Sequence, residues 1–431
     1  MNPRTVPAFG VLLAFLGGLF STLVAQRAGS FIGSAEDPAI RYSTAPLNNI
    51  VEDANRKIQA GAVPLTFEGR SGFLRSALEA LHLPIDSQLL VFSPDSLQGN
   101  LINERNPRAI YFNDRVTLGW VRDGEFIEVA AHDETAGVVF YTLEQRSGAT
   151  YRPPQFMRAV RCTGCHSSGD TLGVPGLVMF STTKPEAGSG LPRRVDHGEP
   201  LARRFGGWFV TGDAGSSPHM GNDLTALKGR AERMLSSAEG LFDPDGYPAM
   251  SSDIVAHLVF AHQIGMTNLL TRASYEARAA DPLLHPPFSS TPEQDERIAS
   301  MMAGVASEVV DYLLFVDESK LASGIRGASG FAERFSAGGP RDRRGRSLYE
   351  LDLNRRLMKY PCSYLIYSPA FDALPRLAKE PIYRRLWDVL SGRENAERYR
   401  SALSLNDRRS IVEILRDTKK DLPQYFQGVI R

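Results

Sequence analysis

Four short β-rich runs between residues 108 and 143 place the strongest constraint on what this 431-residue chain can fold into. Turn residues separate the runs, including an Asp-Gly pair at 123–124. Asp-Gly between two such runs is typical of a tight hairpin, so consecutive runs should pair antiparallel. The runs are 109–112, 116–121, 126–130 and 137–143. They predict an antiparallel sheet in the N-terminal half.

From residue 224 onward the pattern is helical, because apolar residues recur three and four positions apart. Ser251, Ser252 or Asp253 is a candidate cap for the long apolar helix that follows them. Helices are expected at 224–235, 253–280, 293–315, 348–358, 382–390, 397–403 and 408–417. The expected fold class is therefore α+β, with antiparallel strands in a mixed N-terminal part and a mainly helical C-terminal part.

Composition sets bounds on the partners and on the number of domains. The chain has 49 basic and 49 acidic residues, and nothing in this balance indicates a nucleic-acid partner. A hydrophobic content of 42% suits a globular protein, and the length exceeds what one core usually serves. Two domains are therefore expected, at residues 30–220 and 221–431.

The most informative motif, Cys162-Thr-Gly-Cys-His166, directly follows the predicted sheet. Two thiols three positions apart can each add across a vinyl group of haem, and His166 can then bind the iron as an axial ligand. Chance alone would produce this string on the order of once per thousand such chains. A zinc site is disfavoured, because the chain has no second cysteine pair and the histidine is adjacent rather than spaced. The motif predicts one covalent haem c, held by Cys162 and Cys165 with His166 as the proximal ligand.

In this motif the chain resembles the c-type cytochromes, and the resemblance covers Cys162, Cys165 and His166. A small soluble member of that family is a compact helical bundle around its haem. Here a β-rich segment precedes the motif, and Pro153-Pro154 permits only a short helix before and through the cysteines. The haem is therefore expected on a short helix and loop within a larger mixed scaffold.

The whole chain also resembles large, single-haem bacterial proteins that are labelled only as containing a cytochrome c domain. The resemblance rests on the segments 106–113, 206–212 and 360–368. It implies no particular reaction.

The N-terminus indicates export. Residues 1–25 carry one positive charge, Arg4, followed by an apolar run that ends near the small residues Ser21, Thr22 and Ala25. This pattern is typical of a secretory signal, cleaved after Ala25, while an uncleaved membrane anchor is the alternative. Either reading places the rest of the chain in the periplasm or otherwise outside the cytoplasm. The later apolar stretch 254–270 is interrupted by polar residues and is not expected to span a membrane.

The second axial position of the iron decides between functions, because a strong ligand there favours electron transfer and an open position favours small-molecule chemistry. His262 is one candidate, since it lies in the most apolar predicted helix. His257 is a weaker one on the same helix. His219 and Met220 are candidates from a loop that follows the motif. A site with no protein ligand is the remaining alternative.

Two other features have ordinary explanations. Cys362 lies in an apolar and aromatic stretch and is expected to be a small buried side chain. Arg341, Arg343, Arg344 and Arg346 could pair with haem propionates or an acidic partner, but a solvated loop is the favoured interpretation.

Three functions follow as hypotheses. The first is electron transfer by an exported haem protein that exchanges electrons with a partner protein or a small molecule. The second is a haem enzyme of the peroxidase or oxygenase type. The third is a haem sensor without catalytic activity, or a structural subunit of a redox complex. The sequence contains no catalytic constellation that decides between them.

Overall fold

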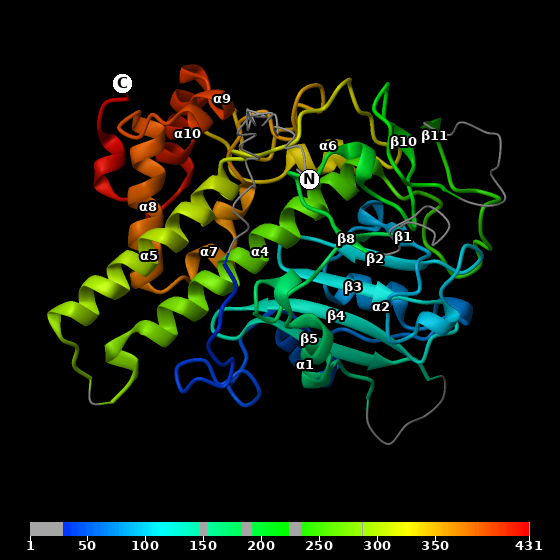
Figure 1. Ribbon diagram of the computed structural model, residues 1–431. Coiled ribbons are helices and arrows are strands. Elements are labelled where there is room, and N and C mark those ends of the chain that lie inside the picture. The colour runs from blue at the N-terminus through cyan, green and yellow to red at the C-terminus, as the bar shows by residue number, and fades with distance from the viewer. Residues whose placement is uncertain (1–28, 147–152, 183–191, 224–233, 287, 431) are drawn as a thin grey trace, which may run out of the picture.

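The computed structural model describes residues 29–146, 153–182, 192–223, 234–286 and 288–430. An antiparallel sheet occupies the N-terminal half and helices dominate the C-terminal part, which confirms the α+β expectation. Figure 1 shows the sheet on one side of the long helix α4 and most of the later helices on the other. The predicted export segment, residues 1–25, lies outside the described residues, as does most of the predicted helix 224–235.

The sheet has seven strands in the order β6-β5-β4-β3-β2-β1-β9, and every neighbouring pair is antiparallel. The four predicted runs are its centre. The turn at 121–124 is closed by a hydrogen bond from Gly124 N to Val121 O, and Asp123 takes a positive φ of 61° in it. The strands are β1 (Leu89–Val91), β2 (Arg108–Phe112), β3 (Val116–Trp120), β4 (Phe126–Asp133), β5 (Gly137–Glu144), β6 (Met157–Arg158) and β9 (Trp208–Phe209). Sequence reasoning missed β1 and β6, which are too short to show alternation.

The two faces of the sheet bury different partners. Ile127 and Val129 of β4 point to one face, where they pack in a core with helices α1 (Ile50–Gln59) and α2 (Leu74–Ala80). Glu128 and Ala130 alternate with them and point to the opposite face. That opposite face carries the Cys-Thr-Gly-Cys-His motif.

Helix α4 (Ile254–Ala280) is the central element of the C-terminal part. Asp253 caps it by accepting hydrogen bonds from Val255 N and Ala256 N, as expected from the sequence. By length and composition alone, it is the one helix among the described ranges that could cross a membrane. However, 89% of its apolar window is buried inside the protein. Its apolar character therefore serves the core.

The helices after α4 pack against it and against one another. Thr291 caps α5 with a reciprocal side-chain and backbone pair, and Ser404 caps α10 in the same way. The helices are α5 (Pro292–Leu313), α6 (Phe331–Ala337), α7 (Pro369–Asp372), α8 (Arg376–Ser391), α9 (Glu397–Ala402) and α10 (Leu405–Thr418). The predictions at 293–315, 397–403 and 408–417 match, while α8 begins before the predicted 382 and includes Pro381.

The predicted helix at 348–358 is wrong. Leu351 instead forms an antiparallel bridge with Met358, and the Asp352 carboxylate accepts hydrogen bonds from the backbone N–H groups of Asn354 and Arg355. Leu353 has a φ of 58°, which a helix does not allow. The local side-chain hydrogen bonds of Asp and Asn therefore override the helical spacing of the leucines.

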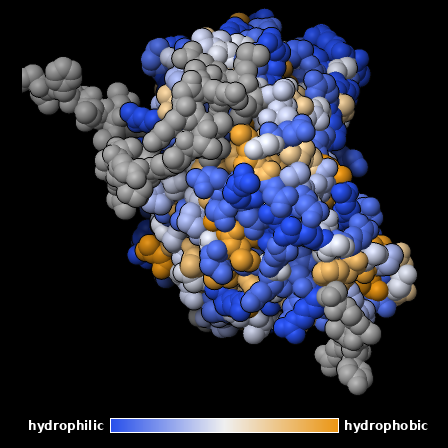
Figure 2. Space-filling view, turned by 90° about the vertical axis from the view of Figure 1, so that its right-hand side faces the viewer, coloured by the Kyte–Doolittle hydropathy of each residue, from blue (hydrophilic) through white to orange (hydrophobic). Residues whose placement is uncertain are grey.

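The main hydrophobic cluster contains residues from both sides of the predicted domain boundary at 220/221, such as Leu89 and Phe112 with Leu313 and Ile411. The boundary stays a prediction. Two small ladders complete the structure: β7 (Phe180–Ser181) with β8 (Arg193–Arg194), and β10 (Gly212–Asp213) with β11 (Met234–Leu235). On the face seen in Figure 2, hydrophilic residues predominate and apolar residues form smaller patches between them.

Candidate haem-attachment site

The motif lies on a short helix that folds back over the sheet. Strand β6 pairs with β5, and Ala159 N still donates to Phe140 O at 2.8 Å. One turn of 3-10 helix, Val160–Cys162, then leads into α3 (Thr163–His166). The expected short helix is therefore present, but it begins later than expected after Pro153-Pro154, because the edge strand comes first.

The two thiols have different surroundings. Cys162 is half-buried and packs against Ala130, Val138 and Phe140 of the sheet. Cys165 is exposed on the next turn. Burial raises the pKa of the Cys162 thiol, and the nearby Glu128 carboxylate adds to the effect. One thiol therefore faces the protein and the other faces outward.

The imidazole of His166 is held in one orientation. Its ring lies against Phe140, with 4.8 Å between the ring centroids. Its Nδ1 is 3.0 Å from the carbonyl oxygen of Gly176, and Gly176 N donates in return to His166 O at 2.9 Å. A carbonyl only accepts, so Nδ1 carries the proton and Nε2 carries the lone pair. Burial lowers the pKa of His166, which favours this neutral form.

A charged pair lies on the same face of the sheet. Arg108 and Glu128 are 2.5 Å apart (Nη2 to Oε2), and both are largely buried. Gly119, opposite Glu128 on the neighbouring strand, makes room for this pair, since a Cβ there would collide with the Arg108 guanidinium. Arg108 Nε is buried and has no hydrogen-bond partner among the described residues. A cation with a free donor at this position could meet a carboxylate of a bound group.

These residues fit a haem. The thiols and the free imidazole nitrogen are the donor set that holds haem c, and all three lie within two turns of one short helix. Met157 and Val160 beside the motif are apolar and exposed, with relative exposures of 53% and 36%. A large apolar ring bound here could cover such side chains.

His262, a candidate for the second axial ligand, is a hydrogen-bonded core residue. Its Nδ1 is 2.8 Å from His197 Nδ1, and its Nε2 is 2.7 Å from Ser363 Oγ. The ring is fully buried and stacks against Phe315 and Tyr312. Both nitrogens are therefore engaged in this structure.

His219 and Met220, the loop candidates, also have local partners. His219 Nδ1 accepts a hydrogen bond from Gly221 N at 3.1 Å. The Ser181 hydroxyl approaches Met220 Sδ at 3.9 Å. His257 points its Nδ1 to Asp253 O, and its buried Nε2 has no partner among the described residues. These contacts assign none of the four residues to the second axial position of the iron.

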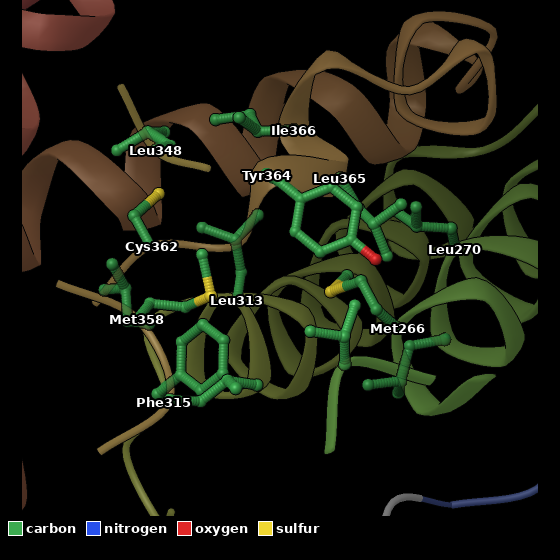
Figure 3. Packing of buried hydrophobic residues seen from close by; sticks show 14 of the residues in the cluster. Met266, Leu270, Leu313, Phe315, Leu348, Met358, Cys362, Tyr364, Leu365 and Ile366 are labelled. Atoms are coloured by element: carbon green, nitrogen blue, oxygen red, sulfur yellow. The ribbon is translucent and has the colours of Figure 1, made fainter. Parts of the chain in front are cut away.

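Cys362, the third cysteine, is fully buried, and burial raises the pKa of its thiol well above the usual range. Figure 3 shows it among Leu348, Met358 and Ile366 in the core around α4 and α5. The expectation of a small buried side chain is confirmed.

Sequence reasoning missed the residues that support His166. Phe140, Gly176 and Arg108 are far from one another in the sequence, and no motif marks them. The alternation in β5 could have placed Phe140 on the face opposite Tyr141, but not beneath the motif. Gly176 follows a proline in a loop, where a glycine has many ordinary explanations.

Within the described residues, no group of three or more His, Cys, Asp and Glu side chains could hold a bare metal ion. No family model, no curated protein and no solved structure matches this chain.

Proposed function

We propose that the chain is an exported c-type haem protein that transfers electrons. One haem would be held covalently by Cys162 and Cys165, with His166 as the proximal iron ligand. The observation that carries the proposal is the hydrogen bond from His166 Nδ1 to the Gly176 carbonyl oxygen. His166 lies at the end of α3, directly after Cys165. The hydrogen bond fixes the proton on Nδ1 and leaves Nε2 free to bind a metal.

The residues of the chain have distinct roles in this proposal. A bound haem supplies an iron that exchanges one electron between Fe(II) and Fe(III). Gly176 orients the His166 ring, and Phe140 packs against it. Arg108 and Glu128 place a positive and a negative charge beside the motif, and each charge would affect the reduction potential of a bound haem.

Export supports the proposal independently. Thioether attachment of haem takes place outside the cytoplasm in bacteria, as the resemblance to c-type cytochromes implies, and residues 1–25 have the pattern of a signal or anchor. The protein would act in the periplasm, free or anchored to the inner membrane. Its partner would be a redox protein or a small electron donor or acceptor.

A second function is favoured by one observation. His262, His219 and Met220 all have partners away from His166. A haem held by His166 with no second protein ligand would bind or activate a small molecule. A haem enzyme of the peroxidase or oxygenase type, or a haem sensor, is therefore the alternative.

Absorption spectra of the haem-loaded protein separate these functions. Electron transfer predicts a low-spin spectrum in both oxidation states that neither carbon monoxide nor peroxide changes. A high-spin haem that binds carbon monoxide would reject electron transfer in favour of the enzyme or sensor.

The attachment itself is tested by the double variant Cys162→Ala plus Cys165→Ala. We expect it to lose covalent haem staining on a denaturing gel. Cys362→Ala is the matched control, because it removes a thiol from the core and leaves the motif intact. Covalent haem that persists in the double variant would refute the attachment.

A further inference from the structure

Asn268 of helix α4 clamps the backbone beside the motif. Its Oδ1 accepts a hydrogen bond from Leu177 N at 3.2 Å, and its Nδ2 donates to Leu177 O at 2.8 Å. One side chain thus satisfies both backbone groups of one residue, as a neighbouring strand would. Asn268 is 3% exposed, so water does not compete freely for these bonds.

The backbone held by Asn268 is connected to the His166 imidazole by hydrogen bonds. Gly176 directly precedes Leu177, and a Cβ at Gly176 would collide with Asn268 Oδ1. The absent side chain allows the loop to lie close against α4. Gly176 in turn exchanges two hydrogen bonds with His166, one with its backbone and one with its ring. Four hydrogen bonds therefore connect a buried helix to the orientation of one histidine ring.

We propose that Asn268 is a positioning residue for His166, acting through Leu177 and Gly176. The effect of Asn268 on an iron ligand rests on the proposed function, whereas its effect on the orientation of the His166 ring does not require a haem. Most residues of the helix that carries Asn268 are buried. The haem site is therefore completed by a helix about a hundred residues further along the chain (268 − 166 = 102).

Loss of the amide has a defined consequence. Leucine at position 268 has the same branching of heavy atoms as asparagine but cannot pair with Leu177, so two poorly hydrated backbone groups lose their partners. The loop then moves to find other partners, and the Gly176 carbonyl leaves His166 Nδ1. In the haem-loaded protein, a weaker Nδ1–H bond makes the imidazole a less basic ligand, which stabilises Fe(III) less. The reduction potential should rise.

The matched control is Gln263→Leu on the same helix. Gln263 is also buried, and its amide also bonds across the core, to Asn113 O and the Tyr364 hydroxyl. It has no hydrogen bond to Gly176 or Leu177 in the described structure. Asn268→Leu and Gln263→Leu therefore remove comparable bonds, and only the first touches the loop beside His166.

The first measurement needs no haem. In the full chain, expressed without the haem-attachment machinery, nitrogen NMR reports which ring nitrogen of His166 carries the proton. Wild type and Gln263→Leu should show the Nδ1–H form. Asn268→Leu should shift the ratio of the two forms by about five-fold, as expected for one ordinary hydrogen bond. Asn268→Asp, which keeps the volume and one acceptor, should shift it less and serves if the leucine variant does not fold.

The second measurement uses the haem-loaded protein. Asn268→Leu should raise the reduction potential, while Gln263→Leu should leave it at the wild-type value. If Asn268→Leu and Gln263→Leu have the same His166 proton position and the same potential, the proposal is overturned. A wild type without covalent haem would refute the proposed function alone, because the NMR comparison on the haem-free chain still decides whether Asn268 positions His166.

Discussion

Two histidine environments in this molecule, those of His166 and His262, show how surroundings rather than residue type make a ligand. His166 lies on a half-buried turn with its Nδ1 bonded to a carbonyl, and its Nε2 has no hydrogen bond to any residue that the structure describes. His262 is fully buried, and both its nitrogens are bonded, to His197 and to Ser363. The first environment selects one protonation form and presents a lone pair. The second uses the same ring as a connector within the core.

Helix α4 takes part in both environments. His262 and Asn268 lie six positions apart on it (268 − 262 = 6), which is less than two turns. His262 joins the helix to the α5 region through Tyr312 and Phe315. Asn268 supports the loop beneath His166 from the same helix. A substitution in α4 can thus affect the core, the site or both, and the following predictions separate these effects.

The largest effect on stability is expected from removing the fully buried histidine, His262, and a smaller one from removing His166. His262→Ala opens a cavity and removes the partner of His197 Nδ1 and one of the two partners of Ser363 Oγ, which also accepts from Leu365 N. This should reduce the free energy of unfolding by about 3 kcal/mol. His166→Ala removes a half-buried ring, so its cost should be about 1 kcal/mol. Denaturant unfolding measures both variants.

The haem readout should show the opposite order. His262→Ala should keep the haem spectrum of the folded protein, while His166→Ala should lose the proximal ligand and change it. If His262→Ala changed the iron spectrum as strongly as His166→Ala does, His262 would be an iron ligand and the contrast between the two environments would be wrong.

Acid should lower the free energy of unfolding, because buried histidines of the core stay neutral only in the folded protein. Burial lowers the pKa of His197 to about 3, with a further contribution from Arg204, and burial lowers that of His257 to about 3. Because these values lie below the ordinary pKa of about 6.5, the unfolded chain binds more protons between the two values. Stability is therefore complete above about pH 6.5 and falls as the pH drops, by up to about 1.4 kcal/mol per pH unit for each imidazole.

His257→Gln tests this pH dependence, because it removes one titrating ring of similar size. Urea unfolding at several pH values below about 6.5 should show a slope smaller by about 1.4 kcal/mol per pH unit than in wild type. His285→Gln is the control of opposite sign. Hydrogen bonds to Asp281 O and Asp37 raise the pKa of His285, so its contribution is present at low pH and lost as the pH rises. Equal slopes in wild type and His257→Gln would contradict the prediction.

A smaller effect is expected at the Arg108–Glu128 pair beside the motif. Arg108→Gln leaves a largely buried carboxylate without its partner and should cost about 1–2 kcal/mol in unfolding free energy. Glu128→Gln should cost a similar amount, and the double variant should cost less than the sum, because each single variant strands one charge. In the haem-loaded protein Arg108→Gln should lower the reduction potential and Glu128→Gln should raise it. Shifts of the same sign would exclude an electrostatic effect on the iron.

The sequence predicted features that depend on neighbouring residues, but not contacts between residues that are far apart in the chain. The four strands and the Asp253 cap were predictable, because alternation, turn chemistry and capping act between near neighbours. Cys162, Cys165 and His166 were singled out for the same reason, since five adjacent residues carry the motif. Asn268 and Gly176 were not, because only the tertiary fold brings them to His166. The sequence could not decide the role of His262, because a histidine in an apolar helix is equally typical of a metal ligand and of a hydrogen-bonded core residue.

The smallest effect is expected on the surface. Arg343 and Arg344 pair with Asp417 and Glu413 of helix α10, so these arginines are engaged there instead of with a haem propionate. Both guanidinium groups are well exposed, and exposed ion pairs contribute less than about 1 kcal/mol. Arg343→Ala plus Arg344→Ala should therefore lower the unfolding free energy by less than about 1 kcal/mol, with the difference shrinking at high salt. Covalent haem and its reduction potential should stay as in wild type. A shift in potential as large as that of Arg108→Gln would instead place the Arg343 and Arg344 loop beside the iron, so that its ion pairs would no longer differ in effect from the Arg108–Glu128 pair.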